Sequence, residues 1–215
     1  MIYIIMGVSG CGKSTLGAFL SEKVIRFSPH LHHVSAHSMT QHSLVCTHQL
    51  GWPMHEGDDY HPQENIEKMS RGEPLTDQLI LVSVLFISFF QVPKERCSDS
   101  DALVVCSALK RIYRQILLFG SKALLASTPD QDILPPVSPG VFFLFLYGDY
   151  DFLHQRMVAR RGHYMKADML RSQFDALEPP LDEENVLPLD IRRSIPDIAM
   201  EVEKHAFSHK SSPRP

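Results

Sequence analysis

What this 215-residue chain has little of excludes several classes of protein. Its four cysteines include no C-x-x-C pair, a pattern typical of free thiols in a reducing compartment. Its net charge of −4 lacks the basic excess of nucleic-acid-binding proteins. Its longest apolar run, residues 79–90, has 12 residues, whereas a membrane-spanning helix needs about 20. No charged region precedes the apolar N-terminus, so no signal peptide is expected. We therefore expect a cytoplasmic protein with no membrane or nucleic-acid partner.

A glycine-rich segment directly after the apolar residues 2–6 has the pattern G-x-x-x-x-G-K-[ST], which binds the phosphates of nucleotides. In such a loop the backbone N–H groups converge on the phosphates, and the following helix adds the positive end of its dipole. Lys13 is expected to reach the β- and γ-phosphates of ATP, and the Ser14 hydroxyl to bind Mg²⁺. The predicted nucleotide-binding residues are Gly7, Val8, Ser9, Gly10, Cys11, Gly12, Lys13, Ser14 and Thr15.

The alternation of apolar runs with helical segments predicts an α/β fold. Strands are expected at residues 2–6, 53–56, 102–106, 141–146 and 186–190. Helices are expected between them and after them, at residues 14–23, 62–71, 109–118, 149–161, 166–177 and 194–207. We predict about five parallel strands with helices on both faces, a three-layer sandwich of the P-loop NTPase type. A single domain should span residues 1–207, and residues 208–215 should form a disordered tail.

Further observations favour a small kinase over other proteins with this loop. The chain contains no N-K-x-D-like tetrapeptide of the kind a GTPase needs, and its second buried strand leads into Ser107 rather than the aspartate of a motor ATPase. Late in the chain a predicted helix carries Arg156, Arg160 and Arg161 and leads to a Gly-His turn. Small kinases use such an arginine-rich lid, here within residues 149–177, to clamp phosphates and exclude water.

Residues 24–49 show neither helical nor strand periodicity and carry six of the twelve histidines. A connection of this length without structure of its own is unusual inside a compact domain. One interpretation is a metal site built from these histidines, although their spacing matches no known ligand pattern. The other interpretation, which we favour, is a solvated insertion.

Five blocks along the chain are similar to those of one family. They are GVSGCGKST at 7–15, GDDYHP at 57–62, GEPLTD at 72–77, CSALKRIYR at 106–114, and GHYM at 162–165 with QFDALEPP at 173–180. In this order they closely resemble the gluconokinase family, small P-loop kinases related to shikimate kinase. The resemblance implies ATP-dependent phosphorylation of D-gluconate at its 6-hydroxyl group, with Mg²⁺ as cofactor, and a possible homodimer.

The resemblance also implies roles for individual residues. Asp58 would join Ser14 in the Mg²⁺ shell and would orient or deprotonate the attacking hydroxyl group. Alternatively, Asp58 only satisfies backbone donors at a helix N-terminus. Together with Lys13, Arg156 and Arg160 would stabilise charge on the transferred phosphoryl group. The candidate donors and cations for gluconate are His61, Lys68, Lys110, Arg114, His163 and Gln173, although His61 and the three cations after it could instead be solvated helix-face groups.

Two segments depart from the family pattern. Residues 24–49 interrupt what should be a short connection from the first predicted helix to Leu50. Residues 79–97 stand where the family pattern has an Asp-Arg pair, a Pro-Trp-Leu motif and an amphipathic helix on the substrate side of the cleft. One hypothesis is that both are translated intron sequence. The first segment and the apolar part of the second end in glutamine, at Gln49 and Gln91, which the codon CAG encodes, and the codons of phenylalanine, leucine, serine and valine can form a pyrimidine-rich tract. Genuine insertions are the alternative. In the first case residues 79–91 would be an exposed, β-prone segment liable to aggregate. The alternatives to gluconate phosphorylation are therefore a nucleotide-binding but impaired variant and a kinase for another small polyol acid.

Overall fold

The computed structural model describes residues 1–22, 50–71, 73, 75–88, 101–125, 140–159 and 168–210. The expected insertion at residues 24–49, with its histidines, lies outside the described residues, and so do residues 89–97 of the second unusual segment. Among the described helices, none is both long enough and apolar enough to cross a membrane.

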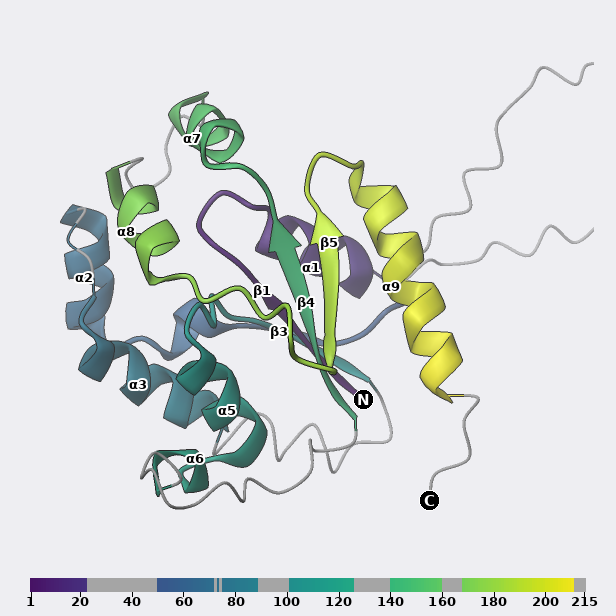
Figure 1. The fold of residues 1–215 in the computed structure, drawn as a ribbon, viewed down its shortest axis with the longest axis horizontal. Helices are drawn as coiled ribbons and strands as arrows, with labels where there is room; N and C mark the ends of the chain where they lie inside the picture. The colour runs from purple at the N-terminus through teal and green to yellow at the C-terminus, as the bar shows by residue number, and fades with distance from the viewer. Residues whose placement is uncertain are drawn as a thin grey trace, which may run out of the picture.

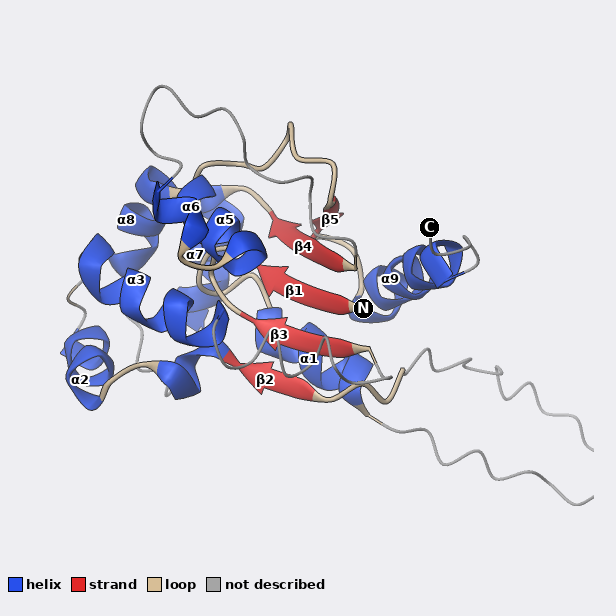
Figure 2. Cartoon of the chain, turned by 90° about the horizontal axis from the view of Figure 1, so that it is seen from below, coloured by secondary structure: helices blue, strands red, loops and turns tan. Residues whose placement is uncertain are grey.

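Within the described part of the chain, five strands form one sheet: β1 Ile2–Met6, β2 Met54–Glu56, β3 Ala102–Val105, β4 Val141–Tyr147 and β5 Val186–Asp190. Their order is β2-β3-β1-β4-β5, and every neighbouring pair is parallel (Figure 2). The central strand β1 is buried along its whole length, which explains its uninterrupted apolar sequence. At the edge, β5 tolerates Pro188, because an edge strand can lack one ladder donor.

Helices cover both faces of this sheet (Figures 1 and 2). On one face, α1 Lys13–Ser21 and α9 Ile195–Lys210 pack against Tyr3 and Ile5 of β1. On the other face, α3 Asp77–Phe86, α5 Arg111–Phe119 and α6 Lys122–Leu125 pack with Ile2 and Ile4. Successive side chains of β1 thus enter opposite cores, as expected for a strand. The predicted three-layer α/β sandwich is confirmed.

Other helices lie beyond the C-terminal ends of the strands. The short helix η1 Gly57–Tyr60 follows β2 and leads into α2 Gln63–Arg71. The helices α7 Tyr150–Ala159 and α8 Asp168–Ala176 follow β4, and Figure 1 shows both beyond the arrowhead of that strand. In open α/β sheets, this edge is where ligands bind.

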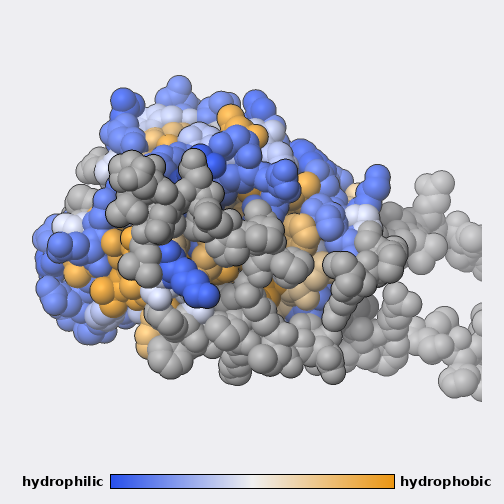
Figure 3. Space-filling view, turned by 60° about the horizontal axis from the view of Figure 1, so that its bottom comes forward, coloured by the Kyte–Doolittle hydropathy of each residue, from blue (hydrophilic) through white to orange (hydrophobic). Residues whose placement is uncertain are grey.

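The first part of the unusual 79–97 segment folds as a helix. Helix α3 stands where a supporting helix was thought to be missing, so that expectation was wrong. Residues 79–88 are helical and partly buried, unlike the exposed β-prone segment that the intron hypothesis would imply. Val84 and Ile87 are 2% and 1% exposed, whereas Val82 and Phe86 are 55% and 44% exposed. Figure 3 shows apolar surface at the end of the molecule where α2 and α3 lie. A helix that is apolar on all sides is usually buried on all sides, whereas α3 buries one side and leaves the other exposed.

The C-terminal helix is longer than predicted, because α9 includes residues 208–210 of the expected disordered tail. The rings of His205 and His209 lie 4.9 and 4.7 Å from the ring of Phe142 on β4. These ring contacts hold the last turns of α9 against the sheet and extend the helix. Residues 211–215 lie outside the described residues.

If the segment after residue 79 belongs to the core, Ile87→Ala should lower the free energy of unfolding by about 2–5 kcal/mol, because it removes buried apolar volume. Val82→Ala on the exposed side of α3 should change it by no more than about 0.5 kcal/mol. Urea unfolding of both variants measures the difference, and equal small losses would show that the segment is not packed.

Candidate active site

The phosphate-binding loop joins β1 to α1 in the geometry that its glycines permit. Gly7, Gly10 and Gly12 have φ angles of 138°, 80° and 98°. A Cβ atom on Gly7 would lie 2.5 Å from the carbonyl oxygen of Leu146, and one on Gly12 would project into open space. Backbone N–H groups in such a succession of conformations can converge on an anion. The loop therefore fits the phosphates of a nucleotide.

Lys13 begins helix α1 and folds back over the loop. Its Nζ atom donates hydrogen bonds to the carbonyl oxygens of Gly7 and Val8, at 2.9 and 3.0 Å. The ammonium group thus lies beside the backbone that would surround a phosphate. This is the position from which a lysine can contact β- and γ-phosphates.

A cavity of about 410 Å³ opens at this edge of the sheet. Its walls come from the phosphate loop, the ends of β2 and β3, and the helices α3 and α8. The predicted site residues that line it are Ser9, Gly10, Gly12, Lys13, Ser14, Thr15, Asp58, His61 and Gln173. One cavity therefore contains the nucleotide loop together with three of the residues expected to act on the acceptor side.

The sequence analysis missed Glu56, the last residue of β2, which also lines the cavity. Burial raises the pKa of Glu56, with a smaller contribution from the carboxylates of Asp58 and Asp59, while a hydrogen bond with Ser14 opposes the shift. A carboxylate with a perturbed pKa in a cavity is a functional candidate. The hydroxyl of Ser14 and the carboxylate of Glu56 are oxygen donors of the kind that Mg²⁺ prefers. The signal was present in the sequence, because Glu56 ends the predicted strand at residues 53–56.

Asp58 and His61 lie close together in the lining of the cavity. The His61 Nε2 atom is 3.8 Å from Asp58 Oδ1, and its Nδ1 atom is 2.8 Å from the Ser83 hydroxyl oxygen. The side chain of Asp58 is 64% exposed, whereas that of His61 is 14% exposed. Burial lowers the pKa of His61, so its imidazole favours the neutral form.

Gln173 on α8 contacts the phosphate loop directly. Its Oε1 atom accepts a hydrogen bond from the backbone N–H of Ser9 at 2.6 Å. The prediction placed Gln173 on the substrate side of the cleft, and the structure brings it to the cavity beside the loop.

Four of the predicted basic residues do not line the cavity, and each has a partner elsewhere in the protein. Lys68 lies 3.6 Å from Glu64 on its own helix, and the Nζ atom of Lys110 donates to both carboxylate oxygens of Asp77. The guanidinium group of Arg156 lies over the ring of Phe152, 5.5 Å from its centroid, and Arg114 is described below. Arg160 and His163 lie outside the described residues.

Arg114 is buried, and its guanidinium group is bound by protein partners. It is 1% exposed, and its Nε and Nη2 atoms donate to the carboxylate of Glu183 at 2.6 to 3.1 Å. Its Nη1 atom donates to the carbonyl oxygens of Ala108 and Leu109, both at 3.1 Å. Burial of a charge requires such complete pairing.

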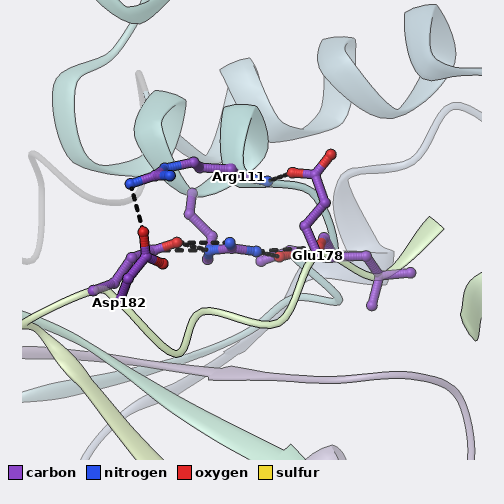
Figure 4. A network of polar contacts seen from close by, with 7 residues as sticks. Arg111, Glu178 and Asp182 are labelled. Atoms are coloured by element: carbon purple, nitrogen blue, oxygen red, sulfur yellow. Dashed lines mark hydrogen bonds and ion pairs between the residues drawn. The ribbon is translucent and has the colours of Figure 1, made fainter.

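The same region carries a second, exposed set of contacts (Figure 4). The backbone N–H of Arg111 donates to Glu178 at 2.6 Å, and its guanidinium group lies 3.3 Å from Asp182. Glu178 therefore satisfies a backbone donor at the first residue of α5. Together, the two sets of contacts tie the start of α5 to the loop before β5.

This network fixes the backbone that forms one wall of the cavity. Ala108 has a φ of 45°, an uncommon conformation for a residue other than glycine. Arg114 holds the carbonyl group of this residue, and the neighbouring carbonyl of Ser107 accepts a hydrogen bond from the N–H of Gly7 at 3.2 Å. Arg114 therefore supports the phosphate loop through the strained turn after β3.

Comparison with known proteins decides the family. No family model matches the chain. It is 31% identical over 201 residues to a probable gluconokinase of Mus musculus, a match that covers 94% of this chain and 95% of the relative. The chain belongs to the gluconokinase family. It is also 34% identical to the thermoresistant gluconokinase of Escherichia coli K12, with 88% of this chain and 84% of the relative covered.

Solved structures agree with this gluconokinase assignment. The crystal structure of a gluconokinase from Sinorhizobium meliloti 1021 matches with a TM-score of 0.63 and 29% identity, over 98% of this chain and 97% of that chain. The family predicted from the five sequence blocks is therefore confirmed, even though residues 79–88 have a sequence unlike the family pattern.

The two arginine networks provide a matched test. Arg114→Ala should lower the free energy of unfolding by about 3–5 kcal/mol, because it leaves Glu183 and two carbonyl groups without their partner. Arg111→Ala removes only an exposed ion pair and should cost no more than about 1 kcal/mol. Urea unfolding of both variants measures the costs, and similar values would contradict the structural role of Arg114.

Proposed function

We propose that this protein catalyses the ATP-dependent phosphorylation of D-gluconate at its 6-hydroxyl group, giving 6-phospho-D-gluconate and ADP. The observation that carries the proposal is a single cavity lined by both the phosphate loop and the Asp58–His61 pair. Membership of the gluconokinase family supports gluconate as the acceptor. A cavity of about 410 Å³ is in the usual size range for sites that bind small molecules.

The phosphate loop would hold the triphosphate of ATP. Its N–H groups would bind phosphate oxygens. The ammonium group of Lys13 would give up its hydrogen bonds to the carbonyl oxygens of Gly7 and Val8 and bind the β- and γ-phosphates instead. Ser14 would hold Mg²⁺, and both Glu56 and Asp58 lie at the end of β2 that faces the cavity. When bound, this ion would offset the negative charge of the β- and γ-phosphates. The hydrogen bond between Glu56 and Ser14 makes Glu56 the better partner for Ser14 in the ion's shell.

Asp58 would orient the 6-hydroxyl group of gluconate and accept its proton. A carboxylate that is exposed to the cavity can approach an acceptor, and it needs no rearrangement of a buried network. His61 would donate a hydrogen bond next to it, and Gln173 would contribute an amide at the phosphate loop. Arg156, Arg160 and His163 remain lid candidates by their place in the sequence. A homodimer also remains a prediction.

The decisive assay is ADP release by the purified protein with MgATP, with and without gluconate. We expect gluconate-dependent turnover that Lys13→Ala abolishes, because the variant loses the cation that contacts the phosphates. ATP binding without turnover would instead identify an impaired variant. Turnover with another polyol acid but not with gluconate would contradict the proposed acceptor.

Two adjacent carboxylates allow a test of the proposed base. Asp58→Asn should lower kcat by about 10²- to 10⁴-fold, because an amide cannot accept the proton of the hydroxyl group. Asp59→Asn should leave kcat nearly unchanged, since Asp59 is exposed and does not line the cavity. Steady-state kinetics with gluconate, and a measurement of ATP binding to both variants, would separate loss of catalysis from loss of the nucleotide. Equal effects of the two substitutions would count against Asp58 as the base.

A further inference from the structure

A serine from the segment that departs from the family pattern lies inside the candidate active site. Ser83 is on helix α3, is 2% exposed, and lines the cavity. Its hydroxyl oxygen is 2.8 Å from the Nδ1 atom of His61, which belongs to a segment 22 residues earlier. Ser83 lies outside the five blocks that carry the family resemblance, so the contact is not one that the resemblance implies.

The position of Asp58 determines the direction of the Ser83 hydrogen bond. A neutral imidazole has one N–H donor and one acceptor nitrogen. The Nε2 atom of His61 lies 3.8 Å from Asp58 Oδ1, where a lone pair would face a negative charge. An N–H at Nε2 replaces this repulsion by attraction, so the proton belongs on Nε2. The Nδ1 atom is then the acceptor, and the Ser83 hydroxyl donates to it.

We propose that Ser83 is a positioning residue that holds His61 in the tautomer protonated on Nε2. The hydrogen bond fixes both the ring orientation and the site of its proton, so that His61 presents an N–H donor to Asp58 and to the acceptor hydroxyl group. The role of this donor in turnover rests on the proposed function, but the tautomer itself does not. Through Ser83, the unusual segment contributes a specific polar group to the acceptor side.

The consequence of losing the hydroxyl follows from the same geometry. Without the Ser83 donor, the Nδ1 atom of His61 loses its partner on α3, and the imidazole can carry its proton on either nitrogen. Each molecule protonated on Nδ1 turns a lone pair toward Asp58. In those molecules the imidazole repels the carboxylate and offers no N–H on that side, so the rate of transfer to the acceptor should fall while nucleotide binding at the phosphate loop is retained.

The test combines the tautomer with kinetics in Ser83→Ala, Ser83→Thr and a matched control, Ser88→Ala. Ser88 is also buried and follows α3, but it does not line the cavity. Long-range ¹H–¹⁵N NMR spectra of the histidine side chains report the tautomer, and the His61 signals are those absent from His61→Gln. Steady-state kinetics give kcat and the KM values for gluconate and ATP.

In the unaltered protein and in Ser88→Ala, we expect the ¹⁵N shifts of His61 to show a protonated Nε2 and an unprotonated Nδ1. In Ser83→Ala the two shifts should move toward each other, as in a mixture of tautomers, and kcat should fall about fivefold, the effect of one lost hydrogen bond. The KM for ATP should stay unchanged. Ser83→Thr keeps the hydroxyl and should restore both the shifts and most of kcat.

Two results would overturn the inference. One is a His61 that carries its proton on Nδ1 in the unaltered protein. The other is a Ser83→Ala variant whose histidine shifts and kcat match those of Ser88→Ala. Because the NMR measurement needs no substrate, it decides the tautomer even if the acceptor is not gluconate. Failure of the proposed function would instead appear as absent gluconate turnover in the unaltered protein.

Discussion

The parallel pairing of β1 between β3 and β4 is the constraint on which the rest of the structure depends. With a neighbour on each side and a helix layer on each face, β1 can carry only apolar side chains. All five described strands run the same way, so their C-terminal ends meet at one edge. That edge receives the phosphate loop from β1, Glu56 and Asp58 from the end of β2, and the strained turn at Ala108 after β3. The sheet thus brings together the short segments that form the floor of the site, and helices α3 and α8 complete its walls.

Much of this arrangement could be predicted because its signals are local. The phosphate loop has a fixed spacing of glycine, lysine and serine, and buried strands have continuous apolar sequences. The roles of the basic residues could not be predicted in the same way, because their partners are distant in sequence. Lys110 pairs with Asp77, 33 residues earlier, and Arg114 pairs with Glu183, 69 residues later. The sequence around a lysine or arginine beside a known motif looks the same whether that residue contacts a substrate or pairs with a carboxylate of the protein.

Helix α3 illustrates a different limit of sequence reasoning. Its apolar residues have no helical periodicity to distinguish a helix from a buried strand, and the sequence there differs from the family pattern. The structure resolves the ambiguity through tertiary contacts. Tyr113 and Lys110 of the α5 region bind Asp77 in the first turn, and Val84 and Ile87 enter the core. The site thereby keeps a helix on its acceptor side, built from a different sequence.

The hydrogen bond from Ser9 to Gln173 joins residues separated by 164 positions, which has a consequence for the order of folding. At synthesis rates of about 5–20 residues per second, Gln173 follows Ser9 after an interval on the order of ten seconds. During that interval β1 also waits for β3, whose first residue pairs with Ile2 across about 100 positions of chain. The phosphate loop is therefore among the last parts of the described chain to acquire its full set of contacts, although it precedes its partners in the sequence. Until β3 and β4 have been synthesised, the central strand of the sheet has no partner on either side, and its apolar side chains have no core to enter.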